Sequence, residues 1–223
     1  MSLEVAVVRV FTDDTGQHGN ELGIVWADAV PTRDRQALAT DLGFSETIFY
    51  SSDGSTRASA TIYTPAAPLP FAGHPTVGLS WWLRERGTPL ETLSVPAADL
   101  AVRYDADLTW IRAKAEWAPV FDIHPVASVD EVDAADPSSF TEGHHYVWAW
   151  TDRDAGAIRS RMFAPDMGIT EDEATGSAAV RISAELSRSL AIRQGSGSQL
   201  FTGYSTEWIE VGGRTVGDRT ITL

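Results

Sequence analysis

A histidine at the start of an apolar helix is the first feature of this sequence that could do chemistry. His74 follows Gly73 in the segment FAGHPTVGLSWWL, and Pro75 comes directly after it. Proline suits the first turn of a helix because the N–H that it lacks would have no partner within the helix. A histidine in this place could bind a substrate or move a proton near neutral pH. It could equally cap the helix or pack beside the Pro-rich loop that precedes it.

A second polar approach to an apolar helix lies in EDEATGSAAVRISAEL, residues 171–186. Thr175, Gly176 and Ser177 open this helix, and hydroxyl side chains in such places usually cap the first turn. Backbone N–H groups around Gly176 could also hold a carboxylate or an oxyanion, because glycine lets a ligand approach the backbone. Asp172 could titrate in such a site, or it could only be a favourable partner for the helix dipole.

A carboxylate is the best candidate for a base that acts on a carbon acid, because the chain contains no Cys. Glu46 starts the apolar strand ETIFY and could lie beside a helix start, although a Glu in that position is usually solvated. Asn20 and Gln194 stand in turn-like segments and could orient a ligand through their amides, or serve the turns alone. His144 and His145 would point in opposite directions on a strand. Neither has neighbours at metal-ligand spacing, so no metal is expected.

The composition excludes several classes of protein. A chain of 223 residues, 43% of them hydrophobic, is long enough to bury a core and could form one large or two small domains. The absence of Cys excludes disulfides, thiolate nucleophiles and thiol-based racemase chemistry. A formal charge of -14 with scattered basic residues argues against nucleic-acid binding. No apolar run is long enough to cross a membrane and no targeting sequence is recognised, so a soluble cytoplasmic protein is expected.

Strands around one long helix are predicted for the first half. The pattern indicates strands at residues 5–11, 23–26, 46–51, 59–63, 93–95, 100–104 and 108–113, the first two forming a hairpin. It also indicates a short helix at 34–42, ended by Gly43, and a long helix at 74–86, ended by Gly87.

The second half follows the same order. A polar stretch at 127–141 is expected to be a solvated loop, followed by strands at 146–150 and 157–163, a helix at 175–190, and strands at 199–204, 207–211 and 220–223. ATIYTP precedes the first long helix and SRMFAP the second, which indicates either a duplication with a cleft between two similar domains or a coincidence. Both helices are apolar on more than one face, so a curved sheet should wrap each of them.

Several motifs, taken together and in order, resemble the PhzF-like phenazine-biosynthesis isomerase family. They are GN at residues 19–20, SETIF at 45–49, FAGHPT at 71–76, ED-x-ATGSAA at 171–179 and QG at 194–195. The resemblance implies an α+β protein with the diaminopimelate-epimerase fold, in which two pseudo-symmetric domains each wrap a barrel-like, mostly antiparallel sheet around a central helix. The domains would span residues 1–117 and 118–223, with the last strand, about 216–223, returning to the first.

The resemblance also implies roles for particular residues. Glu46 would be the acid/base that moves a proton between carbons of a small carboxylic acid, with His74 and Asp172 as its polar partners. Substrate contacts are expected from Asn20, Ser45, Gly73, Thr175, Gly176, Ser177 and Gln194. The family works without a metal or organic cofactor, and the resemblance implies a homodimer.

Two departures from the family pattern leave a second function open. Glu21 and Glu173 stand where the family usually carries Pro, and these carboxylates could border the site. A nearby like charge would raise carboxyl pKa values or repel an anionic substrate. The sequence therefore predicts a cofactor-independent isomerase of a small cyclic or amino carboxylic acid. The alternative is a non-catalytic, carboxylate-binding sensor or carrier.

Overall fold

A closed β-barrel forms the first lobe of the computed structural model, which describes residues 2–223. Its strands follow one another around the ring in the order β1 (Glu4–Thr12), β2 (Asn20–Trp26), β3 (Glu46–Ser52), β4 (Arg57–Tyr63), β6 (Thr92–Val95), β7 (Ala98–Asp105), β8 (Leu108–Ala113) and β15 (Ile209–Thr222). Because β15 also pairs with β1, the ring closes and leaves no free sheet edge. The short strand β5 (Pro68–Leu69) pairs with β4 outside the ring.

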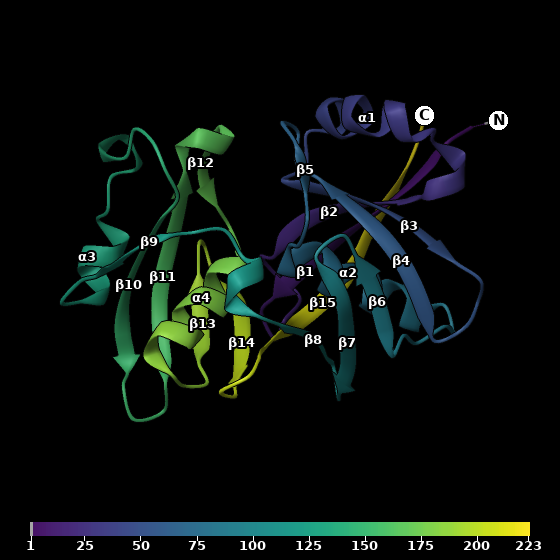
Figure 1. Cartoon of the computed structure of the whole chain (residues 1–223). Helices are drawn as coiled ribbons and strands as arrows, with labels where there is room; N and C mark the ends of the chain where they lie inside the picture. The colour runs from purple at the N-terminus through teal and green to yellow at the C-terminus, as the bar shows by residue number, and fades with distance from the viewer. Residues whose placement is uncertain (1) are drawn as a thin grey trace.

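Helix α2 (Gly73–Glu85) runs inside this barrel, as its apolar sequence predicts (Figure 1). It contacts β1, β2, β3, β8 and β15. Gly78 lies so close to the wall that a Cβ there would come within 2.6 Å of Leu22 and 2.7 Å of Val10. A larger residue at this position would therefore require the Leu22 and Val10 side chains to shift.

An open sheet forms the second lobe. From the end of the barrel, the strand order continues through β14 (Ser198–Tyr204), β13 (Ala191–Gln194), β11 (Ala157–Ala164) and β10 (His145–Asp152) to β9 (Asp122–Pro125). Helix α4 (Gly176–Leu186) packs on β14 and β15, while Glu185 on its other side is exposed. The strand β12 (Ile169–Asp172) pairs with β11 and leads toward α4. Among the described strands this sheet does not close, so the second lobe is a half-open counterpart of the first.

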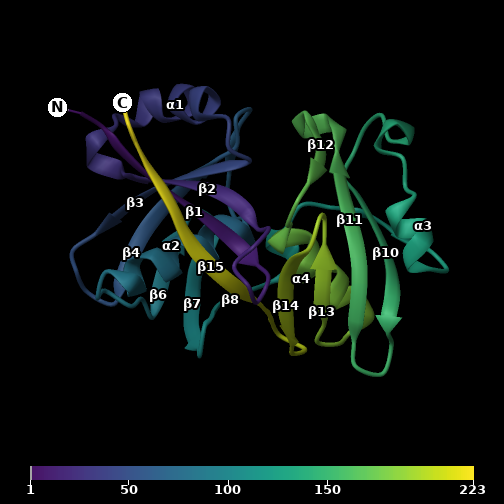
Figure 2. The same ribbon diagram turned by 180° about the vertical axis from the view of Figure 1, so that it is seen from behind.

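Strand β15 passes through both lobes. Its first part, from Ile209, pairs with β8 and β14, and its remainder pairs with β1 as far as Thr222. Figure 2 shows it crossing between the lobes and ending beside the N-terminus, where Leu3 N donates to Leu223 O at 2.9 Å. The sequence predicted two separate strands here, because the glycine-rich, polar stretch at 212–219 has no strand pattern. Hydrogen bonding to the neighbouring barrel strands β1 and β8 makes this stretch a strand although its sequence does not favour one. The division at residues 117 and 118 stays a prediction.

Other predicted elements agree with the structure, with a few corrections. Helix α1 (Arg35–Leu42) ends at Gly43, whose φ of 70° is left-handed as expected of a C-cap. The prediction of a simple loop at residues 127–141 is wrong, because this stretch contains the short helix α3 (Val129–Asp133), which buries Val132. Helix α4 ends at Leu186 rather than at residue 190, because Ser187 adopts a left-handed conformation. The short strands β5, β9, β12 and β13 were not predicted.

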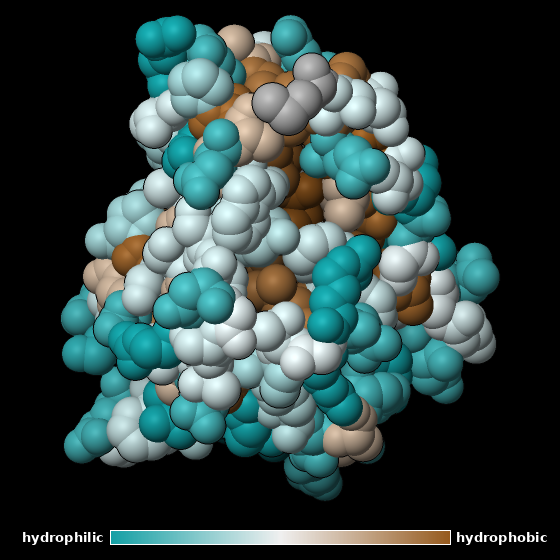
Figure 3. All heavy atoms as spheres, turned by 90° about the vertical axis from the view of Figure 1, so that its right-hand side faces the viewer, coloured by the Kyte–Doolittle hydropathy of each residue, from teal (hydrophilic) through white to brown (hydrophobic). Residues whose placement is uncertain are grey.

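The outer face of the barrel lobe carries a smaller second core beneath α1. Val5, Val25 and Phe49 are buried there against partly buried side chains that include Leu38 and Leu42 of the helix. Figure 3 shows this side of the molecule as mainly hydrophilic, with apolar residues visible between the polar ones.

Candidate active site

A carboxylate and an imidazole lie in direct contact at the start of two elements of the first lobe. Glu46 is the first residue of β3 and His74 is the second residue of α2. His74 Nδ1 lies 2.8 Å from Glu46 Oε2, and His74 Nε2 lies 3.2 Å from the Asn20 carbonyl oxygen. The His74 side chain is 3% exposed and that of Glu46 is 17% exposed. The carboxylate is thus the member of the pair that solvent can reach.

The Asn20 carbonyl fixes where the protons of this pair can be. A carbonyl oxygen only accepts hydrogen bonds, so Nε2 of His74 carries a proton and donates it to Asn20. The short contact between Nδ1 and Glu46 then needs one further proton, held either by His74 in an ion pair or by Glu46 in a neutral pair. The arrangement can therefore take up or release a proton at Glu46 with His74 as its immediate partner.

The side chain of Asn20 connects this pair to the second lobe. Its Nδ2 donates to Asp172 Oδ1 at 2.6 Å and to the Ala174 carbonyl at 3.3 Å. Ser45 Oγ donates to Asn20 Oδ1 at 3.1 Å, which fixes the orientation of the amide. Asn20, predicted as a turn residue, is the first residue of β2 and joins the two lobes.

Asp172 lies at the end of β12 and receives a hydrogen bond on each carboxylate oxygen. Thr175 Oγ1 donates to Oδ2 at 2.5 Å, opposite the bond from Asn20 to Oδ1. Gln194 Nε2 donates to Thr175 Oγ1 at 2.8 Å and to the Asp172 carbonyl at 2.9 Å. Gln194 is fully buried at the end of β13, so it supports Asp172 rather than a turn alone.

Burial is the main influence on the acidity of Asp172. Burial, followed by the negative charge of Glu46, raises the pKa of Asp172 to about 7. The hydrogen bond from Thr175, the charge of His74 and the hydrogen bond from Asn20 act in the opposite direction. A carboxyl group with this pKa can exist in both protonation states near neutral pH.

The two helix starts meet backbone to backbone. A Cβ on Gly73 would lie 3.0 Å from Gly176 Cα, and a Cβ on Gly176 would lie 3.1 Å from His74 N. Neither α2 nor α4 has a hydrogen bond from a side-chain cap, and neither has an acidic residue in its first turn. The expectation that the Thr175 side chain caps α4 is wrong, because its oxygen accepts from Gln194 Nε2 rather than from a backbone N–H of the first turn, and its hydrogen goes to Asp172. Ser177 is half-buried on the first turn of α4.

The structure therefore joins most of the predicted site residues in one hydrogen-bonded network. It contains Ser45, Asn20, Glu46, His74, Asp172, Thr175 and Gln194. Gly73 and Gly176 lie beside the network as the contact between the helix starts. No hydrogen bond within the described chain joins the Ser177 side chain to it.

Glu21 and Glu173, the two carboxylates that depart from the family pattern, bond to groups outside the network. Glu21 pairs with Arg219 on the barrel surface, with an oxygen–nitrogen distance of 2.6 Å. Glu173 accepts from the backbone N–H of Ser196 and from Ser198 Oγ. Neither residue is among the influences on the pKa of Asp172. Ser198 is a participant that sequence reasoning missed, since nothing distinguishes it within the turn GSGSQ.

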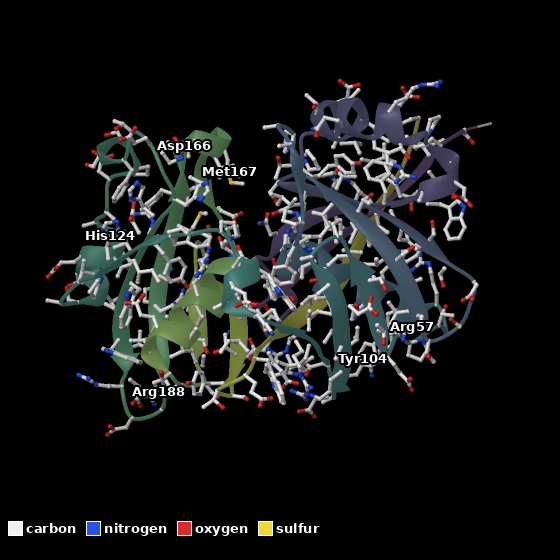
Figure 4. The ribbon with its side chains drawn as sticks, viewed as in Figure 1. Arg57, Tyr104, His124, Asp166, Met167 and Arg188 are labelled. Atoms are coloured by element: carbon white, nitrogen blue, oxygen red, sulfur yellow. The ribbon has the colours of Figure 1, made fainter. Side chains whose placement is uncertain are left out.

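The histidines of the second lobe lie apart from the network. His124, in β9, lies at the outer edge of the lobe (Figure 4), and its Nε2 is 3.0 Å from His145 Nδ1. His144, which precedes β10, packs near Phe121 instead, so the adjacent histidines have different partners. Within residues 2–223, no group of three or more His, Asp or Glu side chains is placed to hold a metal ion. None of the helices in the same range is long and apolar enough to cross a membrane.

A closed barrel and an open sheet, each holding a helix whose first turn meets the other, define an epimerase-like fold. The family model for phenazine biosynthesis-like proteins, PhzC-PhzF, matches residues 8–102 and 111–206. The chain belongs to this family, as the sequence motifs predicted.

Similar proteins support the same family and fold. The chain is 29% identical to trans-2,3-dihydro-3-hydroxyanthranilate isomerase of Pseudomonas fluorescens, a match that covers 83% of this chain and 80% of that protein. It superimposes with a TM-score of 0.80 on a PhzF family protein of Enterococcus faecalis at 18% identity, covering 100% and 99% of the two chains. A hydroxyproline epimerase from Agrobacterium vitis has a TM-score of 0.64 at 12% identity, with 100% and 92% covered. The class of enzyme that these comparisons support is an isomerase.

Proposed function

We propose that this protein is a cofactor-independent isomerase that moves a proton between carbon atoms of a small carboxylic acid. The observation that carries the proposal is the contact between Glu46 and His74, in which a partly exposed carboxylate shares one proton with a buried imidazole. A carbon-bound proton is weakly acidic, so its removal needs a positioned base and stabilisation of the charge that develops.

Glu46 would take the proton from one carbon and return it to another. In the ion-pair state Glu46 is a carboxylate that can take this proton on Oε1, while its Oε2 keeps the hydrogen bond from His74 Nδ1 and His74 Nε2 stays bonded to the Asn20 carbonyl. Asp172, with its pKa raised to about 7, would donate from its protonated form toward developing negative charge. Backbone N–H groups in the first turns of α2 and α4 would receive the substrate carboxylate.

A small cyclic or amino carboxylic acid is the proposed class of substrate. The name of the Pseudomonas fluorescens relative, which is an isomerase of a hydroxyanthranilate, supports this class. We also propose that the protein forms a homodimer and is located in the cytoplasm. Light scattering of the purified protein would test the dimer.

Solvent-deuterium incorporation into candidate acids would test the role of Glu46. We expect exchange to be lost in Glu46→Gln while circular dichroism remains unchanged. Glu21→Gln is the matched control, since it makes the same change in a carboxylate that pairs with Arg219 on the surface. Unchanged exchange in Glu46→Gln would remove this residue from the central role.

The non-catalytic alternative rested on Glu21 and Glu173. Because the structure bonds both carboxylates to other groups, no structural observation favours that function. Tight binding of an acid without any proton exchange would support it.

A further inference from the structure

Glu173 forms a second connection between the lobes, beside the bond from Asn20 to Asp172. Ser198 Oγ donates to Glu173 Oε1 at 2.7 Å and accepts from the Gly19 backbone N–H at 2.9 Å. The hydroxyl is fully buried and thus acts as a fixed relay between a carboxylate and a backbone amide. We call this chain of contacts the Glu173–Ser198–Gly19 bridge.

Two residues of the bridge are sequence neighbours of residues in the candidate active site. Glu173 follows Asp172, and Gly19 precedes Asn20. The Asn20 amide itself bonds to Asp172 and Ala174, the two neighbours of Glu173. Three consecutive residues of the second lobe therefore hold two consecutive residues of the first, and a shift at Gly19 must be transmitted to Asn20.

Close packing makes the bridge stiff. A Cβ on Gly19 would lie 2.8 Å from Thr12 Cγ2 and 2.9 Å from the Val10 carbonyl, so this backbone has no room to move toward β1. A Cβ on Gly197 would lie 2.7 Å from the His18 ring, so the turn before Ser198 packs directly on the first lobe. Both oxygens of Glu173 are within hydrogen-bond distance of the Ser196 backbone N–H, which orients the carboxylate.

We propose that Glu173 is a positioning residue, which acts through Ser198 and Gly19 to hold Asn20 against Asp172 and the Asn20 carbonyl against His74. The inference rests on the proposed function, because it gives Glu173 a role in the geometry of that site. It assigns to Glu173 a function that requires no contact with substrate.

The carboxyl titration of Asp172, followed by carbon-13 NMR without substrate, tests the bridge. The hydrogen bond from Asn20 lowers the pKa of Asp172, so loosening Asn20 should raise that pKa further above about 7. We expect this rise in Glu173→Ala and in Ser198→Ala. We also expect kcat/KM to fall by about ten-fold or more, since small displacements of positioned groups are costly to catalysis.

Two further variants control the experiment. Glu173→Gln keeps an oxygen that can accept from Ser196 and Ser198, so it should restore much of the titration and activity. Ser196→Ala should match the wild type, because Ser196 contributes only its backbone N–H. If Glu173→Ala does not fold, Ser198→Ala and Glu173→Gln still decide the question.

Two results would overturn the proposal. One is an Asp172 titration in Glu173→Ala and Ser198→Ala that matches the wild type together with unchanged kcat/KM. The other is a loss of activity with an unchanged titration, which would make Glu173 a substrate contact. The titration needs no turnover, so it separates failure of the bridge from failure of the proposed isomerase, which Glu46→Gln tests independently.

Discussion

Gly73 and Gly176 touch through their backbones where the two lobes meet. A Cβ added to either glycine would lie 3.0 Å from the Cα atom of the other. Each glycine begins a helix that packs on the sheet of its own lobe, so neither backbone can move without displacing a packed helix. The contact thus sets the distance between the two halves of the hydrogen-bonded network.

Gly176→Ala should separate the helix starts. We expect a loss of about 1–3 kcal/mol in the free energy of unfolding, as for other overpacked sites, together with reduced turnover. Urea denaturation and deuterium incorporation measure the two effects. Gly217→Ala is the matched control, because no atom lies within 4 Å of a Cβ at that position. Equal stability and turnover of the two variants would show that the contact between the helix starts can accommodate a methyl group.

The raised pKa of Asp172 predicts a pH dependence of stability. Folding raises this pKa from 3.8 to about 7, so between these pH values the folded state keeps a proton that the unfolded state has lost. The stabilisation is therefore complete below about pH 4 and is lost as the pH rises through about 7, with a slope of at most about 1.4 kcal/mol per pH unit. In Asp172→Asn this part of the slope should vanish. Urea denaturation at several pH values between about 5 and 8 measures this slope, and parallel curves for the two proteins would contradict the assignment.

Asn20→Asp should place two carboxyl groups in contact. The Asn20 amide donates to Asp172 Oδ1 at 2.6 Å, and an aspartate there could donate only if one of the pair took a proton. We expect the variant to lose about 2–4 kcal/mol of stability at neutral pH and to regain part of it on acidification. Gln199→Glu makes the same chemical change beside Arg214 and should be close to neutral. Similar losses in both variants would argue against a specific effect at Asp172.

Thr175→Val tests the hydroxyl that links Gln194 to Asp172. Its removal deprives the buried Gln194 amide of an acceptor and Asp172 of a donor, at a cost of about 1–3 kcal/mol. The pKa of Asp172 should rise, because the bond from Thr175 lowers it. Thr175→Ser keeps the hydroxyl and should retain the wild-type titration, measured by carbon-13 NMR. A helix cap would give a different result, with stability lost and the titration unchanged.

Local patterns predicted the elements that carry strong signals. The apolar helix that begins within FAGHPT and the alternating strands around it agree with the structure, because burial on several faces requires apolar residues around the whole helix. The strands β9, β12 and β13 were not predicted, because each is short and contains charged residues, such as Asp122, Glu171 and Arg193, that hide an apolar pattern. The polar stretch containing α3 was misjudged because one buried residue, Val132, gives little signal among acidic neighbours.

The sequence by itself determined the family, the helix starts and the residue types available for proton transfer. The order of its motifs and the absence of Cys were sufficient for these conclusions, since both can be read without knowing the fold. Only the tertiary structure decided which of those residues meet. Asn20 and Asp172 are 152 positions apart and bond at 2.6 Å, while Thr175 donates to Asp172 instead of capping its helix. Such pairings depend on how β15 and the contact between Gly73 and Gly176 bring the lobes together, and no local pattern encodes a distance between segments so far apart in the chain.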